Sequence, residues 1–193
     1  MKRLALSTAA VLLAGPAMAH TGHGVADGFL HGLEHPVFGM DHLLAMVTVG
    51  LWSGFVLPQR SWAGAAAFMW AMVLGAAASW NGIGLPGVEG VITASVVAFG
   101  LLVLVARREQ GAGMTAASLA AIAAFALAHG HAHATEATGQ ALAYLAGFLI
   151  ATAGLHLAGI GLARAVAEGR LARLLQRVLG AGVALGGLVL AFG

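Results

Sequence analysis

The sequence predicts an all-α fold: a polytopic membrane protein in which six transmembrane helices form a bundle after a cleaved signal peptide. Three observations lead to this prediction. Hydrophobic residues make up 60% of the chain and charged residues only 8%, whereas a soluble domain carries roughly 25% charged residues. Apolar segments of bilayer-spanning length recur along the chain, and the arginines between them follow an alternating pattern.

The N-terminus has the layout of a secretory signal peptide. Lys2 and Arg3 precede a short apolar run, which leads to a small-x-small cleavage site ending at Ala19. An uncleaved first span is the less favoured alternative, because the apolar run is shorter than the ~20 residues that a span requires. We therefore predict a signal peptide at residues 1–19 and one six-helix transmembrane domain at residues 20–193, whose mature N-terminus lies outside the cytoplasmic membrane.

Six apolar segments follow, each close to the length that crosses a bilayer. They do not alternate polar and apolar residues, as the strands of a membrane β-barrel would. The predicted spans are residues 36–57, 61–79, 88–106, 115–134, 139–163 and 174–192.

The distribution of positive charge predicts the orientation of these spans. The second and fourth connections contain no Lys or Arg, whereas arginines lie in or beside the first, third and fifth connections: Arg60, Arg107, Arg108, Arg164, Arg170, Arg173 and Arg177. The positive-inside rule therefore places the odd-numbered connections in the cytoplasm. This agrees with the N-terminus outside, and it accounts for the basic charge without a nucleic-acid partner.

Polar residues gather at the predicted outer ends of the spans. On a helix, His129, His133 and Glu136 share one face, while His131 points to the opposite side. Because Pro36 suits the first helical position, we expect His35 at the start of the first helix and His42 two turns further along. The candidate metal ligands are His35, Asp41, His42, His129, His133, Glu136 and, at the start of the third span, Glu89.

These residue types favour a divalent metal ion. The chain has no cysteine, so any ligand is a nitrogen, an oxygen or a thioether, for which Met46 is a candidate. Imidazole and carboxylate suit ions such as nickel, cobalt and zinc, and one such ion would neutralise both Asp41 and Glu136. Hydrogen bonding between helices is the alternative for these groups. For His156, which lies deeper in the fifth span, metal binding and hydrogen bonding between helices stay equally open. For Glu89, metal binding and capping of its helix stay equally open.

Two motifs resemble those of the HupE/UreJ family of bacterial nickel permeases. The family signature of His, five residues, Asp and His is matched by His35, Asp41 and His42. Its second signature, Phe-His-Gly-x-x-His-Gly-x-Glu, is matched by "AHGHAHATE" at His129, Gly130, His133 and Glu136, with Ala128 in place of the aromatic residue and Ala134 in place of the second glycine.

The resemblance implies a permease that takes up nickel, with cobalt as another candidate cargo, for the maturation of hydrogenase or urease. It implies transported Ni²⁺ rather than a prosthetic group, no enzymatic activity, and the bacterial inner membrane as the location. The expected partners are a divalent metal ion and the bilayer; a homo-oligomer and a metallochaperone stay open. The rival function is an intramembrane zinc-dependent hydrolase, and a membrane metal sensor or accessory subunit is a third.

Overall fold

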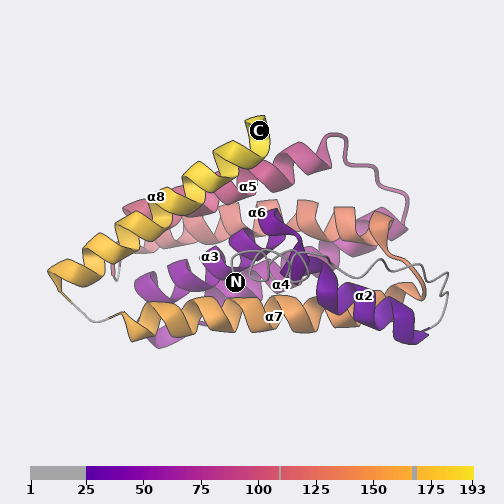
Figure 1. Ribbon diagram of the computed structural model, residues 1–193, viewed down its shortest axis with the longest axis horizontal. Helices are drawn as coiled ribbons and strands as arrows, with labels where there is room; N and C mark the ends of the chain where they lie inside the picture. The colour runs from indigo at the N-terminus through magenta and orange to yellow at the C-terminus, as the bar shows by residue number, and fades with distance from the viewer. Residues whose placement is uncertain (1–24, 109, 167–168) are drawn as a thin grey trace, which may run out of the picture.

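The computed structural model describes residues 25–108, 110–166 and 169–193, and all regular structure in these ranges is helical (Figure 1). The signal peptide predicted at residues 1–19 lies outside them. The elements are α2 (Val25–Phe38), α3 (Met40–Val56), the short 3₁₀ turn η1 (Pro58–Arg60), α4 (Ala63–Trp80), α5 (Val88–Val105), α6 (Ala112–Glu136), α7 (Ala141–Ala165) and α8 (Arg170–Phe192).

Helices α4 to α8 are each long and apolar enough to cross a membrane, and α2 and α3 together pass the same test as one bent pair, which brings the spans to six. Large apolar side chains such as Trp70 (72% exposed) lie on the outside of the bundle, where a bilayer but not water accommodates them. The predicted all-α, six-span membrane bundle is confirmed. The bounds of the last five spans also agree closely, with the largest difference at α8, which was predicted from residue 174 and begins at Arg170.

The first span differs from its prediction, because it begins earlier and is broken. Helix α2 ends at Phe38, Gly39 interrupts the helical backbone, and α3 leaves the break at an angle of 76°. The expectation that Pro36 opens the helix was wrong: Pro36 lies inside α2, and His35 lies in the last turn of that helix. Proline has no N–H to donate to the preceding turn, which weakens a helix at that point. The helix ends two residues later, at Phe38.

Helix α2 packs closely against α7 because small residues repeat along one of its faces. Gly28, Gly32 and Pro36 are buried at every fourth position, and a Cβ at Gly32 would overlap the backbone of Tyr144 in α7. Close backbone approach of this kind is a common way for membrane helices to pack. Figure 1 shows the result, with α2 lying beside α7 at one end of the bundle.

Glycines also bring α3 against α7 in the middle of the bundle. A Cβ at Gly50 would overlap the carbonyl oxygen of His156, and one at Gly54 would overlap Ala163. Gly50 and Gly54 stand four residues apart, a small-xxx-small spacing that predicts close helix packing in lipid, and these contacts confirm that role. Gly182 and Gly186 in α8 have the same spacing in the sequence and would be expected to pack in the same way, but they do not: a Cβ at Gly182 would meet nothing within 4 Å, and one at Gly186 would meet only Leu44 Cδ1, at 3.6 Å. Gly180 and Gly187 make the close contacts instead, with α5.

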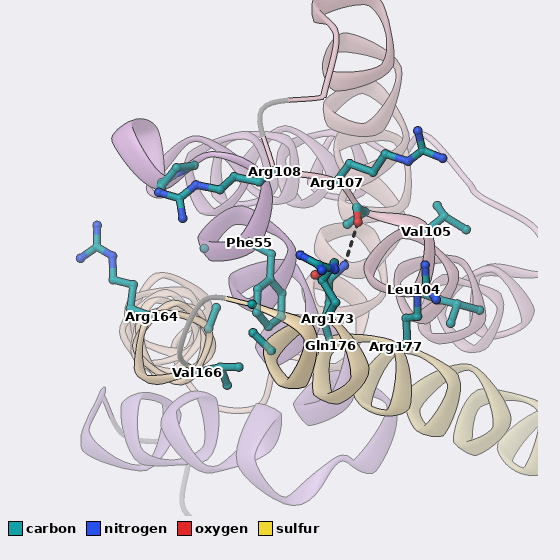
Figure 2. A pocket seen from close by; sticks show the side chains of 16 residues that line it. Phe55, Leu104, Val105, Arg107, Arg108, Arg164, Val166, Arg173, Gln176 and Arg177 are labelled. Atoms are coloured by element: carbon teal, nitrogen blue, oxygen red, sulfur yellow. Dashed lines mark hydrogen bonds between the residues drawn. The ribbon is translucent and has the colours of Figure 1, made fainter.

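The arginines gather at the other end of the bundle from the histidines. Between Tyr144, beside the histidines, and Arg164, near the end of α7, twenty residues of helix span about 30 Å. A cavity of about 1070 Å³ opens at this arginine end, between the ends of α3, α5, α7 and α8 (Figure 2). The two ends of the bundle thus differ in their chemistry, histidine and carboxylate at one and guanidinium at the other.

Candidate metal centre

The break between α2 and α3 places two histidines face to face. His35 comes from the last turn of α2 and His42 from the first turn of α3, and their ring centroids are 5.3 Å apart. On one straight helix, seven residues would separate the two Cα atoms by about 10 Å along the axis. The bend at Gly39 therefore creates a convergence that a continuous helix would not provide.

His133 from α6 completes a three-histidine cluster. Its ring lies 4.8 Å from that of His35 and 4.4 Å from that of His42, measured between centroids. One ring nitrogen from each of the three residues lies within 4.8 Å of the other two. Two signature segments some ninety residues apart thus meet at one point.

Asp41 determines which ring nitrogen of His42 keeps a lone pair for a metal ion. The His42 Nδ1 atom lies 2.6 Å from Asp41 Oδ1, and the backbone N–H of His42 donates to the same oxygen at 2.9 Å. Because a carboxylate accepts hydrogen bonds, the ring proton sits on Nδ1 and the lone pair on Nε2. Nε2 is buried without a hydrogen-bond partner. A carboxylate that orients a histidine in this way is typical of metal sites.

Glu136 lies at the mouth of the cluster. Its Oε2 atom is 3.6 Å from His35 Nε2 and 3.7 Å from His133 Nδ1. The Glu136 side chain is 43% exposed, whereas His133 is 2% exposed and packs on Phe148, with ring centroids 3.9 Å apart. An exposed carboxylate therefore lies beside His35, whose side chain is 26% exposed, and beside His133, which is shielded from solvent.

His129 lies one helical turn deeper in α6, beside His42, with ring centroids 5.1 Å apart. The Ser95 hydroxyl donates its hydrogen to the Ile92 carbonyl at 2.6 Å, so its oxygen accepts the bond from His129 Nε2 at 3.0 Å. This leaves a lone pair on His129 Nδ1, which is buried and has no partner. His129 thus presents one more free nitrogen below the three-histidine cluster.

His156 in α7 repeats this pattern still deeper in the bundle. Its Nδ1 atom donates to the Thr152 carbonyl of the same helix at 2.8 Å, so Nε2 carries the lone pair and is buried without a partner. The ring of Phe68 lies between the two deep histidines, 5.4 Å from His129 and 5.1 Å from His156 between centroids. Met46, the candidate thioether, instead accepts a hydrogen bond from the Thr152 hydroxyl at 3.3 Å.

Two further polar residues, His131 and Glu89, do not belong to the three-histidine cluster. His131 faces away from the cluster, as its helical position predicts, and its Nε2 donates to the Ile83 carbonyl in the connection between α4 and α5 at 2.7 Å. Glu89 is exposed in the first turn of α5 and lines a shallow groove between α5 and α8. Among the described residues, its carboxylate makes no hydrogen bond or ion pair with the histidines.

His31, which lies one turn before His35 in α2, is not among the candidate ligands predicted from the sequence. Its ring is 5.8 Å from that of His35, and its Nδ1 is 2.6 Å from the Thr138 hydroxyl. The i, i+4 spacing of His31 and His35 was the available signal, but it has meaning only once residues 25–38 are recognised as a helix. His31 therefore extends the line of imidazoles outward from the cluster.

The buried ring nitrogens without hydrogen-bond partners lower the stability of the folded protein. A buried polar atom without a hydrogen bond costs about 1–3 kcal/mol, and in this region the described residues include such atoms on His42, His129, His133 and His156. Nearly all buried polar groups in proteins have partners. A line of neutral imidazoles with free lone pairs suits successive coordination of a borderline divalent cation.

Comparison with known proteins places the chain in a family. The family model described as "HupE / UreJ protein" matches residues 8–190. Among curated proteins, "Protein HupE" of Rhizobium leguminosarum bv. viciae is 39% identical over 196 residues, an alignment that covers the whole of both chains. No solved structure matches the chain.

Proposed function

The chain belongs to the HupE/UreJ family, a membrane-transporter type of family rather than an enzyme class, and on this basis we propose that it takes up nickel across the cytoplasmic membrane. Cobalt is the second candidate cargo. The nickel would serve the maturation of hydrogenase or urease, the role associated with the family. Residues 20–193 form the permease domain, and residues 1–19 form the signal peptide removed from it.

One observation carries the proposal: three ring nitrogens, from His35, His42 and His133, lie within 4.8 Å of one another. Two nitrogens bound to one ion at about 2.1 Å are at most about 4.2 Å apart, so small side-chain rotations bring these donors into coordination. Such an arrangement favours capture without the tight, closed geometry of a structural site. A transported ion must also leave its site, and conduction requires binding that is not too strong.

Carboxylates complement the positive charge of the cargo. Asp41 and Glu136 flank the three histidines, and the three imidazoles are neutral donors when they bind a metal. A divalent cation entering this centre therefore meets two compensating negative charges. This matters because an uncompensated charge within a bilayer is costly, at about 2.5–3.5 kcal/mol per group on insertion scales.

The orientation follows from the arginines. They gather at one end of the bundle, and the positive-inside rule assigns that end to the cytoplasm. The cluster of His35, His42 and His133 then faces the outside, as does the mature N-terminus. In this orientation the metal is captured from the periplasmic side of the inner membrane.

His129 and His156 provide the inward part of the path. Each keeps one buried, unpartnered ring nitrogen, and the Phe68 ring separates them. An ion that leaves the outer cluster can exchange imidazole ligands stepwise, first to His129 and then to His156, once Phe68 rotates. Several successive sites of moderate affinity are what permeation requires.

The test is initial metal uptake by cells that lack their own nickel transporters, with the wild-type chain compared with His42→Ala at equal membrane abundance. We expect saturable nickel accumulation with the wild type and its loss in the variant, with cobalt competing at excess. Zinc uptake that exceeds nickel uptake would reject the assigned cargo. Equal nickel uptake by the variant and the wild type would reject the assigned path.

A further inference from the structure

The cavity at the arginine end is lined by an unusual concentration of one side chain. Arginine residues at the end of α5, at the end of α7 and in the first turns of α8 line it (Figure 2). The five lining arginines are Arg107, Arg108, Arg164, Arg173 and Arg177. The metal path does not use them, since they lie at the end of the bundle remote from the three histidines.

Specific hydrogen bonds hold the walls of this cavity. Gln176 Nε2 donates to the carbonyls of Val103 at 2.9 Å and Ala106 at 2.8 Å, which ties the start of α8 to the end of α5. Arg164 Nη2 donates to the Ser61 hydroxyl at 2.7 Å, which ties the end of α7 to the connection between α3 and α4. The arginines are therefore carried by helix ends whose relative positions are maintained.

The positive charge around the cavity exceeds the negative charge that the chain can supply there. The connections that flank the cavity contain two acidic residues in the sequence, Glu109 and Glu168, and both lie outside the described residues. Setting these two carboxylates against the five lining arginines leaves three positive charges (5 − 2 = 3). The five arginines are exposed, so water screens part of their mutual repulsion, and an anion seated among them would be attracted by all of them.

The remaining lining residues indicate what kind of anion fits. Phe55, Leu104, Val105 and Val166 contribute apolar side chains beside the guanidinium groups (Figure 2). The cavity also lies where the apolar helices end, which is the depth of the lipid headgroups. A ligand with a phosphate and an attached hydrocarbon chain complements both parts of this surface.

We propose that this cavity binds the phosphate headgroup of an anionic phospholipid. Guanidinium groups bind phosphate oxygens through paired, charge-assisted hydrogen bonds, and basic pockets between transmembrane helices bind anionic headgroups. The lipid links the ends of α5, α7 and α8 by neutralising their arginines. Free inorganic phosphate has the same headgroup chemistry, but it has no chain for the apolar wall.

The test compares lipid retention by the purified full-length protein. The cavity variant is Arg173→Gln/Arg177→Gln, and the matched control is Arg60→Gln/Arg170→Gln, two arginines at the same end that do not line the cavity. Native mass spectrometry counts the phosphatidylglycerol molecules retained from mixed phosphatidylglycerol and phosphatidylcholine micelles. Thermal unfolding in phosphatidylcholine alone serves as the folding check for both variants.

We expect the wild type and the control to retain phosphatidylglycerol in preference to phosphatidylcholine. The cavity variant should bind it about 30-fold more weakly, since each arginine near a headgroup contributes about a fivefold effect. Arg173→Lys/Arg177→Lys, which keeps the charge but loses the paired geometry, should fall between them. Equal retention by the cavity variant and the control would overturn the proposal. Stabilisation by millimolar inorganic phosphate that matches the effect of the lipid would reject a lipid as the source of the phosphate.

Discussion

Asp41 and His42 are adjacent in the sequence and hydrogen-bonded through their side chains, with 2.6 Å between Asp41 Oδ1 and His42 Nδ1. This bond leaves Nε2 of His42 without a hydrogen-bond partner, in a ring whose centroid lies 5.3 Å from that of His35 and 4.4 Å from that of His133. Asp41 therefore acts on the metal through His42 as well as through its own charge.

Asp41→Asn tests this relationship. The amide keeps the shape of the side chain, but it loses the negative charge, and its NH₂ group can hold His42 in the wrong tautomer. We expect nickel affinity to fall about 10- to 100-fold, the usual effect of losing the partner of a metal-binding histidine. Isothermal titration of the purified protein measures it. Glu34→Gln, an exposed carboxylate on α2, is the control, and equal affinities for the two variants would show that Asp41 has no such role.

His131→Ala and His133→Ala separate two histidines of the same helix segment. His133 belongs to the three-histidine cluster, whereas His131 donates to the Ile83 carbonyl. We expect His133→Ala to lose at least about tenfold in nickel affinity. His131→Ala should keep wild-type affinity and lose only about 0.5–1.5 kcal/mol of stability, the usual contribution of one hydrogen bond. Similar losses of affinity in both variants would contradict the assigned helical face.

His156→Phe tests the inward path separately from metal capture. The substitution removes the deep unpartnered nitrogen but keeps a planar ring beside Phe68. We expect unchanged nickel affinity at the outer cluster and an uptake rate lowered about tenfold or more, because one binding step is lost. The exposed neighbour Leu157, changed to Ala, provides the control. A wild-type rate in His156→Phe would show that ions leave by another route.

Gly50→Ala tests the close contact of α3 with α7. A methyl group at Gly50 overlaps the His156 carbonyl, whereas one at Gly161 in α7 meets nothing within 4 Å. We expect Gly50→Ala to destabilise the protein by about 1–3 kcal/mol, as overpacking usually does, and Gly161→Ala to have little effect. Thermal unfolding in detergent measures the difference. Equal stability of the two variants would mean that the helices are not packed as closely as described.

The sequence predicted the membrane class and most of the spans because apolar length is a strong signal in lipid. It also predicted that the segments around His42 and His133 lie at the same end of the bundle, because the positive-inside rule places the start of the first span and the end of the fourth span on the same side of the membrane. Their actual contact needed the packing of the helices. The resemblance to the family depended on the same residues and agrees with the match found over residues 8–190.

The broken first span could not be predicted by hydropathy. Residues 25–38 contain Asp27, Glu34 and two histidines. Hydropathy therefore predicts a polar segment before the first span and not a helix. The small residues Gly28 and Gly32 hold α2 against α7, and that contact depends on a partner far along the chain. Pro36 favours the first turn of a helix, so its place in the last turn of α2 could not be predicted from the residue itself.

The most direct test of the central claim is the coordination of nickel in the purified protein, measured by X-ray absorption at the nickel edge with less than one equivalent bound. The account predicts that the three histidines with nitrogens within 4.8 Å of one another, His35, His42 and His133, all bind the ion. The imidazole signal should therefore be strong in the wild type and should fall in each single alanine variant, but not in His131→Ala. A spectrum explained by oxygen ligands alone, or an imidazole signal that all three variants leave unchanged, would contradict the account.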